Sequence, residues 1–132
     1  MSFDDRYIAY TYKYSSGNVG IWVYDRDTRS TRVIINEQDK LIIKQIAFLN
    51  EEVPPIIAFI GKDNDRTSPS YGIEDIYTID VLGGNLTKLT NNGAPEYSIY
   101  GRLSTGIRSG GNYLIYSKRN KEWTDYGKSD IY

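Results

Sequence analysis

The chain contains no cysteine and no histidine among its 132 residues. Without cysteine it can form neither disulfides nor thiolate metal sites. Without histidine it cannot build a Ser-His-Asp triad, a Cys-His pair or an imidazole zinc site, and it lacks the commonest general base near neutral pH. Any catalysis would have to use carboxylates, lysines or tyrosines. We expect a non-enzymatic protein with no catalytic residue, no metal ligand and no cofactor.

Long apolar runs and an excess of one charge are also absent. No segment approaches the roughly 18 apolar residues of a membrane span. The 16 basic and 17 acidic side chains leave a net charge of −1, so the positive excess that drives phosphate-backbone binding is missing. The first six residues, Met-Ser-Phe-Asp-Asp-Arg, are acidic and lack an apolar segment, so we do not expect them to belong to a signal peptide. We expect a cytoplasmic protein that binds neither nucleic acid nor membranes.

The chain has instead a repeated pair of β-strand patterns rich in tyrosine and isoleucine. The first pattern of each pair is four residues long and closes with an aromatic residue, at Tyr10, Phe59 and Tyr116. The second carries an isoleucine that recurs at intervals of 55 residues, as Ile21, Ile76 and Ile131. A fixed period of this size predicts stacked units, none of which can bury its apolar face alone.

β-Branched and aromatic residues dominate the regular segments, Gly, Asn, Asp and Ser gather between them, and no segment shows a helical period. The predicted strands form three units within one partial domain, residues 1–132. The first unit, residues 1–36, has predicted strands at 6–14, 19–24 and 30–35. The second, residues 42–91, has strands at 43–49, 55–60, 75–79 and 85–89. The third, residues 96–132, has strands at 98–107, 112–117 and 129–132. The sequence therefore predicts an all-β fold of antiparallel units.

Two segments carry a family resemblance. Residues 4–10, Asp-Asp-Arg-Tyr-Ile-Ala-Tyr, resemble the Ser-Pro-Asp-Gly-Lys-x-Ile-Ala-Phe signature of TolB-like propeller blades, but they lack its Pro and Gly. Residues 75–90, Asp-Ile-Tyr-Thr-Ile-Asp-Val-Leu-Gly-Gly-Asn-Leu-Thr-Lys-Leu-Thr, resemble the strand, turn and strand of the same family and of prolyl-oligopeptidase-type propellers. The resemblance implies four-stranded propeller-type blades, about two and a half to three of them, in an incomplete or oligomer-closed ring.

Two loops join equivalent strands of successive units, residues 62–74 and 119–128. In a propeller such loops project on one face, and loops on a rigid scaffold often carry function. Residues 63–74 begin like a calcium loop, but Ser68 stands where that loop needs glycine, so a solvated hairpin loop is favoured over a metal site. The candidate binding residues in these two loops are Asp63, Asp65, Arg66, Tyr71, Arg119, Trp123 and Tyr126.

Alternation by two places Tyr10, Tyr12 and Tyr14 on one strand face. Such a stripe could stack sugars or peptides, whereas packing between blades is the favoured interpretation. Trp22 is interpreted in the same way. The aspartates that recur at strand ends, such as Asp25 and Asp80, are interpreted as turn formers rather than as a glycosidase pair.

We expect a non-catalytic propeller scaffold or binding module, which could be a fragment of a larger propeller protein. Its expected partner is a protein or peptide, or a further copy of the chain bound through open sheet edges. The alternative is the substrate-filtering propeller of a prolyl-oligopeptidase-type serine peptidase whose catalytic domain lies outside this sequence. A sugar-binding composite ring that uses Trp123 is a more distant alternative.

Overall fold

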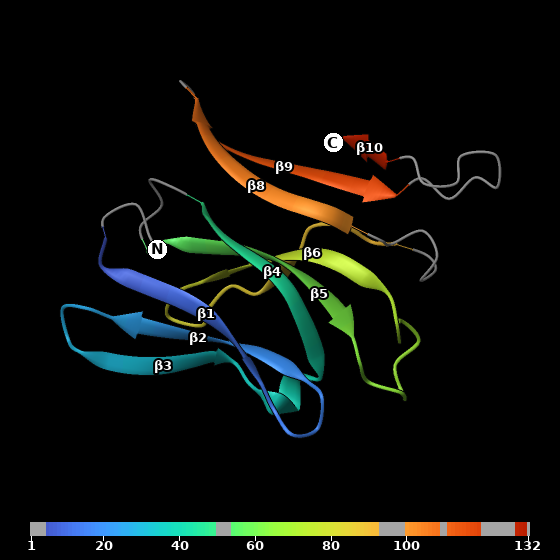
Figure 1. The fold of residues 1–132 in the computed structure, drawn as a ribbon, viewed down its shortest axis with the longest axis horizontal. Coiled ribbons are helices and arrows are strands. Elements are labelled where there is room, and N and C mark those ends of the chain that lie inside the picture. Colours follow the sequence, from blue (N-terminus) through green and yellow to red (C-terminus); the bar gives the residue numbers. More distant parts are fainter. Residues whose placement is uncertain (1–4, 50–53, 93–99, 109–110, 120–128, 132) are drawn as a thin grey trace.

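The structure is a computed structural model that describes residues 5–49, 54–92, 100–108, 111–119 and 129–131, with side chains up to residue 92. Within these ranges the regular structure is β-strand apart from one short 3₁₀ turn, so the all-β prediction is confirmed (Figure 1). The elements in chain order are β1 (Tyr7–Lys13), β2 (Val19–Asp25), β3 (Ser30–Ile35), η1 (Glu37–Asp39), β4 (Leu41–Leu49), β5 (Ile56–Asp63), β6 (Glu74–Asp80), β7 (Thr87–Lys88), β8 (Tyr100–Arg108), β9 (Gly111–Arg119) and β10 (Ser129–Ile131).

The first three strands form an antiparallel meander, hereafter the first meander, with β2 in the middle. A tight turn joins β1 to β2: the Tyr14 amide donates to the Asn18 carbonyl at 2.8 Å, and the Gly17 amide donates to the Tyr14 carbonyl. Gly17 has φ of 94°, which a residue without a Cβ adopts at no steric cost. The register set by this turn places Tyr10 opposite Trp22.

The second meander runs from β4 to β7, again antiparallel. All four predicted strands are present, but β4 begins two residues earlier than predicted and β5 continues three residues beyond residue 60. The last strand shortens from residues 85–89 to Thr87–Lys88. Beyond that point the Leu89 amide still donates to the Ile76 carbonyl at 2.7 Å, and side chains supply the contacts that follow. The fully buried Asp75 accepts hydrogen bonds from the Thr90 hydroxyl at 2.7 Å and the Asn92 amide at 3.0 Å. Because a buried carboxylate needs such partners, the segment after β7 is held to β6 without forming a strand.

The two meanders share one seven-stranded sheet in the order β1-β2-β4-β5-β6-β7, with β3 paired to β2. A single parallel pair, Val19 with Ile42, joins β2 to β4. The remaining strands form a separate sheet in the order β10-β9-β8. Of its strands, β8 lies alongside β4 and also approaches β5 (Figure 1). Among the described residues, no helix is long and apolar enough to cross a membrane.

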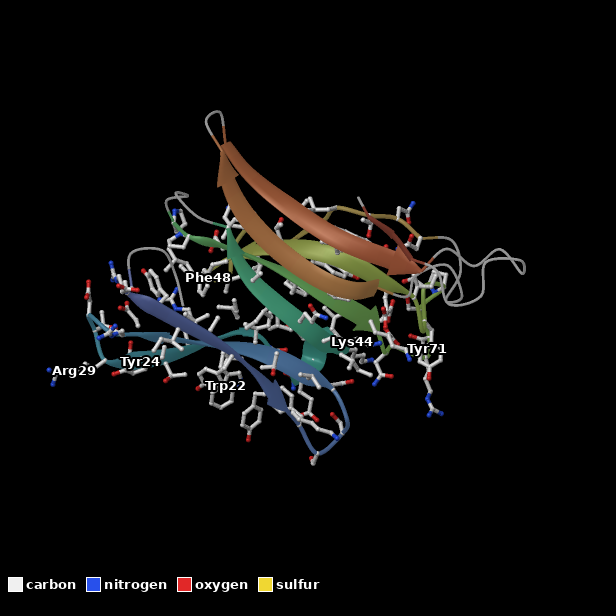
Figure 2. All side chains as sticks on the ribbon, turned by 45° about the horizontal axis from the view of Figure 1, so that its top comes forward. Trp22, Tyr24, Arg29, Lys44, Phe48 and Tyr71 are labelled. Carbon is white, nitrogen blue, oxygen red and sulfur yellow. The ribbon has the colours of Figure 1, made fainter. Side chains whose placement is uncertain are left out.

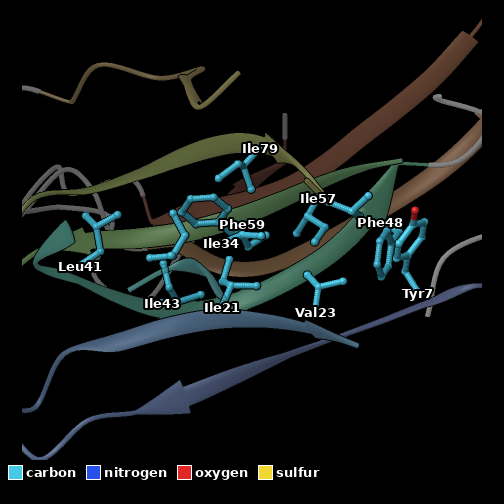
Figure 3. Packing of buried hydrophobic residues seen from close by; sticks show 12 residues of the cluster. Tyr7, Ile21, Val23, Ile34, Leu41, Ile43, Phe48, Ile57, Phe59 and Ile79 are labelled. Atoms are coloured by element: carbon cyan, nitrogen blue, oxygen red, sulfur yellow. The ribbon is translucent and has the colours of Figure 1, made fainter. Parts of the chain in front are cut away.

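The main core lies between the first and second meanders, which face one another (Figure 3). Strand alternation supplies both sides: every second residue of β2 points toward β5 and β6, and every second residue of β5 and β6 points back. The fully buried members include Phe59 and Ile57, both 0% exposed. The buried residues of this core are Tyr7, Ile21, Val23, Ile34, Ile35, Leu41, Ile43, Phe48, Ile57, Phe59, Ile79 and Val81.

The opposite face of the second meander carries a smaller core. Ala58, Ile60 and Ile76 are buried there, with Ala47 and Leu49 packed against them. This is the face that alternation gives to the even-numbered residues of β5, and β8 approaches β4 and β5. The second meander is therefore apolar on both faces, as expected of a sheet that has neighbours on both sides.

An ion pair joins the start of β1 to the end of β2. The Arg6 guanidinium donates through Nε and Nη2 to the two oxygens of Asp25, each at 3.0 Å, and it lies 5.0 Å from the centre of the Tyr7 ring. Asp25 also accepts the amide of Asp27 at 3.0 Å. In the second meander Asp80 accepts the amides of Leu82 and Gly84 at 2.9 Å. The prediction that the recurring aspartates shape turns is confirmed at both positions.

Replacing Phe59 by alanine should reduce the free energy of unfolding by about 3–5 kcal/mol, because the substitution leaves a cavity in the main core. Urea unfolding at fixed protein concentration measures the loss. Leu82→Ala is the matched control: Leu82 is 52% exposed, and its removal should change the stability by no more than about 0.5 kcal/mol. Equal losses for the two variants would show that the meanders do not pack as described.

The Arg6–Asp25 pair should make stability depend on pH. The hydrogen bonds from Arg6 lower the pKa of Asp25 from 3.8 to about 2. A carboxylate whose pKa is depressed by folding stabilises the fold above its unfolded pKa and loses that contribution as the pH falls through its folded pKa. We predict that the urea midpoint falls between about pH 4 and about pH 2, and falls less for Asp25→Asn. Parallel pH profiles for the two proteins would contradict the prediction.

Candidate functional site

Three connecting segments meet at the end of the first sheet where β1 and β5 finish (Figure 1). They are the β1–β2 turn, the β3–β4 connection that contains η1, and the β5–β6 loop. We call residues 14–18, 36–40 and 63–73 the rim. The sequence singled out only the last of these segments as a binding loop, and its four described candidates, Asp63, Asp65, Arg66 and Tyr71, all lie within the rim.

A line of asparagine hydrogen bonds ties the three segments together. Asn64 Nδ2 donates to Asn18 Oδ1 at 2.7 Å, and Asn18 Nδ2 donates to the Glu37 carbonyl at 3.1 Å. The Asn64 amide donates to the Lys40 carbonyl at 2.9 Å. Asn18 is buried, and a buried side-chain amide that is fully bonded fixes the groups around it. The rim is therefore one connected structure rather than three separate loops.

Asp63 organises the β5–β6 loop from its first residue. Its Oδ2 accepts the hydroxyls of Ser68 at 2.7 Å and Ser70 at 2.6 Å, and its Oδ1 accepts the Asp65 amide at 2.8 Å. Partial burial raises the pKa of Asp63, but the hydrogen bonds from Ser70, Asp65 and Ser68 outweigh it, so the pKa lies below its ordinary value. Asp63 is thus an ionised turn-forming residue at neutral pH.

Asp65 shapes the next turn. Its Oδ1 accepts the Thr67 hydroxyl at 2.7 Å and the Thr67 amide at 3.0 Å, and Lys40 Nζ lies 3.8 Å away. These hydrogen bonds lower the pKa of Asp65, and Lys40 adds to the effect. The carboxylates that made the segment resemble a calcium loop therefore bond to the loop itself. In the described part of the chain, no group of three or more acidic residues is arranged to hold a metal ion.

Arg66 and Tyr71 are among the residues that the loop exposes to solvent, together with Thr67 and Pro69. Arg66 is exposed and Tyr71 is 44% exposed; Figure 2 shows Tyr71 at the outer end of the loop. Their backbone is fixed by turn hydrogen bonds, with the Tyr71 amide donating to the Ser68 carbonyl at 3.2 Å and the Gly72 amide to the Asp63 carbonyl at 2.7 Å. The arrangement displays an aromatic ring and a guanidinium on a rigid support.

The second predicted loop is only partly described. Arg119 ends β9, on the same side of Figure 1 as the end of β5, but its side chain lies outside the description. Trp123 and Tyr126 lie outside the described residues, so their role in binding stays a prediction.

No motif in the sequence indicates that Asn18 and Lys40 belong to this site. Asn18 comes near the β5–β6 loop because a parallel pair joins β2 to β4. Lys40 comes near it because the next residue, Leu41, pairs with Asp63 in the antiparallel β4–β5 ladder. One local signal was present: Asn36 and Asp39 form a capping box around η1, with the Gln38 amide donating to Asn36 Oδ1 and the Asn36 amide donating to Asp39 Oδ2. Such a box marks the start of a helical turn.

An aromatic cluster forms a second exposed feature, on the side of the first meander away from the core. Tyr12 stacks on Trp22 with ring centres 4.3 Å apart, Tyr14 meets Tyr12 edge-on at 5.0 Å, and Trp22 Nε1 donates to the Tyr14 hydroxyl at 3.1 Å. Tyr10 lies 6.2 Å from Trp22. The favoured interpretation placed these rings between blades, whereas no other described part of the chain covers Tyr10 or Tyr12, which are 38% and 42% exposed.

A small cavity of about 110 Å³ lies at the other end of the strands, between the β2–β3 hairpin and the turn after β6. Its charged lining residues already have partners within the chain. Asp25 bonds to Arg6, and Arg32 Nη1 donates to the Leu82 carbonyl at 3.1 Å. The cavity therefore offers a ligand little unused polar chemistry.

No protein-family model matches this chain. A search of curated proteins also returns no match. The candidate site accordingly rests on the geometry of the rim and on the sequence itself.

The hydrogen bond between Asn18 and Asn64 should appear as an energetic coupling. In a double-mutant cycle with Asn18→Ala and Asn64→Ala, we predict a coupling of about 0.5–1.5 kcal/mol in the free energy of unfolding, since each substitution leaves the other side chain without its partner. Pairing Asn18→Ala with Leu86→Ala is the control. Leu86 makes no hydrogen bond to the rim, so that pair should be additive, and additivity in both pairs would refute a connected rim.

Proposed function

We propose that this protein is a non-catalytic binding module, built from β-propeller-type units, that contacts a protein or peptide through its rim. The observation that carries the proposal is the β5–β6 loop, in which Asp63 and Asp65 hold the backbone while Arg66 and Tyr71 face solvent. Binding surfaces gain affinity when their contact residues are fixed in advance, because less conformational entropy is lost on association.

The chemistry of the displayed residues favours a protein or peptide. Arginine and tyrosine are enriched among the residues that dominate binding energy at protein interfaces. Tyrosine adds a large contact area with few rotatable bonds, and its hydroxyl adds a hydrogen bond. The rim loop supplies one of each within six residues, and Lys40 adds a second cation on the neighbouring connection.

The repeated units support the propeller part of the proposal. Tyr10 lies opposite Trp22 in the first meander, and Phe59 lies opposite Tyr77 in the second. These pairs occupy the positions that the sequence repeat makes equivalent. Asp25 and Asp80, which close the second strand of each pair, both accept amides of the turn that follows. The two meanders thus use the same residues for the same structural purposes, as repeat units do.

The carboxylates of the rim support a non-catalytic role. A general acid at neutral pH needs a raised carboxyl pKa, whereas the pKa values of Asp63 and Asp65 are lowered by hydrogen bonds within the loop. These side chains serve the structure of the loop. A binding role is compatible with Asp63 and Asp65 as ionised residues that hold the loop in place.

Panning a phage-displayed library of linear peptides against the chain tests the proposal. We expect enrichment of peptides whose affinity falls about 10-fold or more in Tyr71→Ala or Arg66→Ala, as when an interface anchor is removed. Leu86→Ala, an exposed apolar truncation away from the rim, is the matched control and should leave the affinity unchanged. A library that yields no binder, or binders indifferent to both rim variants, would overturn the assignment.

A further inference from the structure

The outer face of the first meander is largely apolar and carries no charged side chain at its paired positions, and Ile8, Tyr10, Tyr12 and Val33 are exposed on it. We call it the front face. Cross-strand pairing places on it one residue from every second position of β1, β2 and β3, and Figure 2 shows Trp22 and Tyr24 on this side of the meander, away from the second meander. Its members are Ile8, Tyr10, Tyr12, Trp22, Tyr24, Thr31 and Val33. A contiguous face of this kind on a small protein marks an interaction site.

The second meander shows what covers such a face. At the equivalent positions Phe59 and Tyr77 stack with ring centres 5.2 Å apart, as Tyr10 and Trp22 lie together in the first meander. Phe59 is 0% exposed where Tyr10 is 38% exposed. The cover on Phe59 is the opposite, or rear, face of the first meander, through residues such as Ile21 and Val23. Within this chain, therefore, a front face is buried by the rear face of another meander.

We propose that the front face of the first meander is a docking surface for a second copy of this chain, which binds through the rear of its β8–β10 sheet. The inference rests on the proposed function in one respect, namely that the three groups of strands are repeat units. It goes beyond that proposal by naming the surface, the occupant and the direction of stacking.

The position of the β8–β10 sheet argues for a second copy as the occupant. One side of that sheet approaches β4 and β5, and its other side faces away from the rest of the described chain (Figure 1). The front face lies at the opposite end of the stack. A second copy placed front to rear therefore continues the contact already made between the first and second meanders. Such contacts are heterologous and build rings or open arrays.

The side chains of the front face are also held in place before any partner binds. Trp22 is held by its hydrogen bond to Tyr14 and by stacking against Tyr12, so these rings lose little freedom on association. The face carries no Asp, Glu, Lys or Arg at its paired positions. Association through it therefore incurs no penalty for removing charges from water.

Light scattering on the chromatographed chain across a concentration series tests the inference. We expect a mass above 15.1 kDa for the wild type, and at least about 10-fold weaker association for Tyr10→Glu and Tyr12→Glu. Both side chains are exposed, so the variants should keep the wild-type circular dichroism. The control is Leu86→Glu, which adds the same charge beside the open edge strand β7. It should associate like the wild type; loss of association in this control alone would assign assembly to the sheet edge instead.

A mixing experiment fixes the direction. Fluorescently labelled Tyr10→Glu protein keeps an intact rear face, so in front-to-rear stacking it binds wild-type chains and ends their assemblies. If two front faces met each other instead, the labelled variant would join no wild-type assembly. Capping by the variant supports the inference, and its exclusion overturns it.

The outcome is separable from that of the proposed function. A monomeric wild-type chain would overturn the docking surface while leaving peptide binding at Tyr71 and Arg66 untouched. Conversely, the labelled variant could cap wild-type assemblies while no peptide bound in a way that depends on the rim. That result would support the docking surface and overturn peptide binding by the rim.

Discussion

The structure depends on the burial of apolar side chains between the first and second meanders. Either meander alone would leave in water the apolar side chains that now pack between them, and their burial is favourable. Facing one another, they remove Ile21 and Val23 on one side and Phe59 on the other from solvent. At roughly 25 cal/mol per Å² of apolar surface, this contact is the main favourable contribution to folding. The single parallel pair between β2 and β4 only has to set the position of one meander against the other.

The rim is a consequence of that packing. Because the meanders are held at a fixed position, the β1–β2 turn and the β5–β6 loop finish close together, and Asn18 can reach both Asn64 and the carbonyl of Glu37. The apolar core sets the positions of these loops, and hydrogen bonds from polar groups then fix the conformation of each loop. Asp63 and Asp65 accept hydrogen bonds from the loop itself, whereas Arg66 and Tyr71 are exposed to solvent.

The same packing explains why Phe59 is buried while Tyr10, at the matching position of the first meander, is exposed. Phe59 and Tyr77 are covered by the first meander, and burial raises the pKa of Tyr77 to about 12. Tyr10 and Trp22 have the same pairing in the first meander but lie at the end of the stack. A repeat architecture always leaves such terminal faces, which are either capped by polar residues or used in assembly. Here the face is aromatic and uncharged, which favours assembly.

The sequence by itself determined the strands. Alternation and turn residues predicted all ten strands of the described residues, with ends that agree to within three residues. Ile21 and Ile76, which are 55 residues apart, precede Trp22 and Tyr77, and these two residues pair with Tyr10 and Phe59. These are local properties, fixed by the period of the strand and by turn chemistry. Tertiary structure decided the length of β7, where the buried Asp75 captures the following segment with its side chain. It also decided that Asn18 and Lys40 join the rim and that Tyr10 faces solvent, because these outcomes depend on which sheet lies against which, and no local pattern encodes that contact.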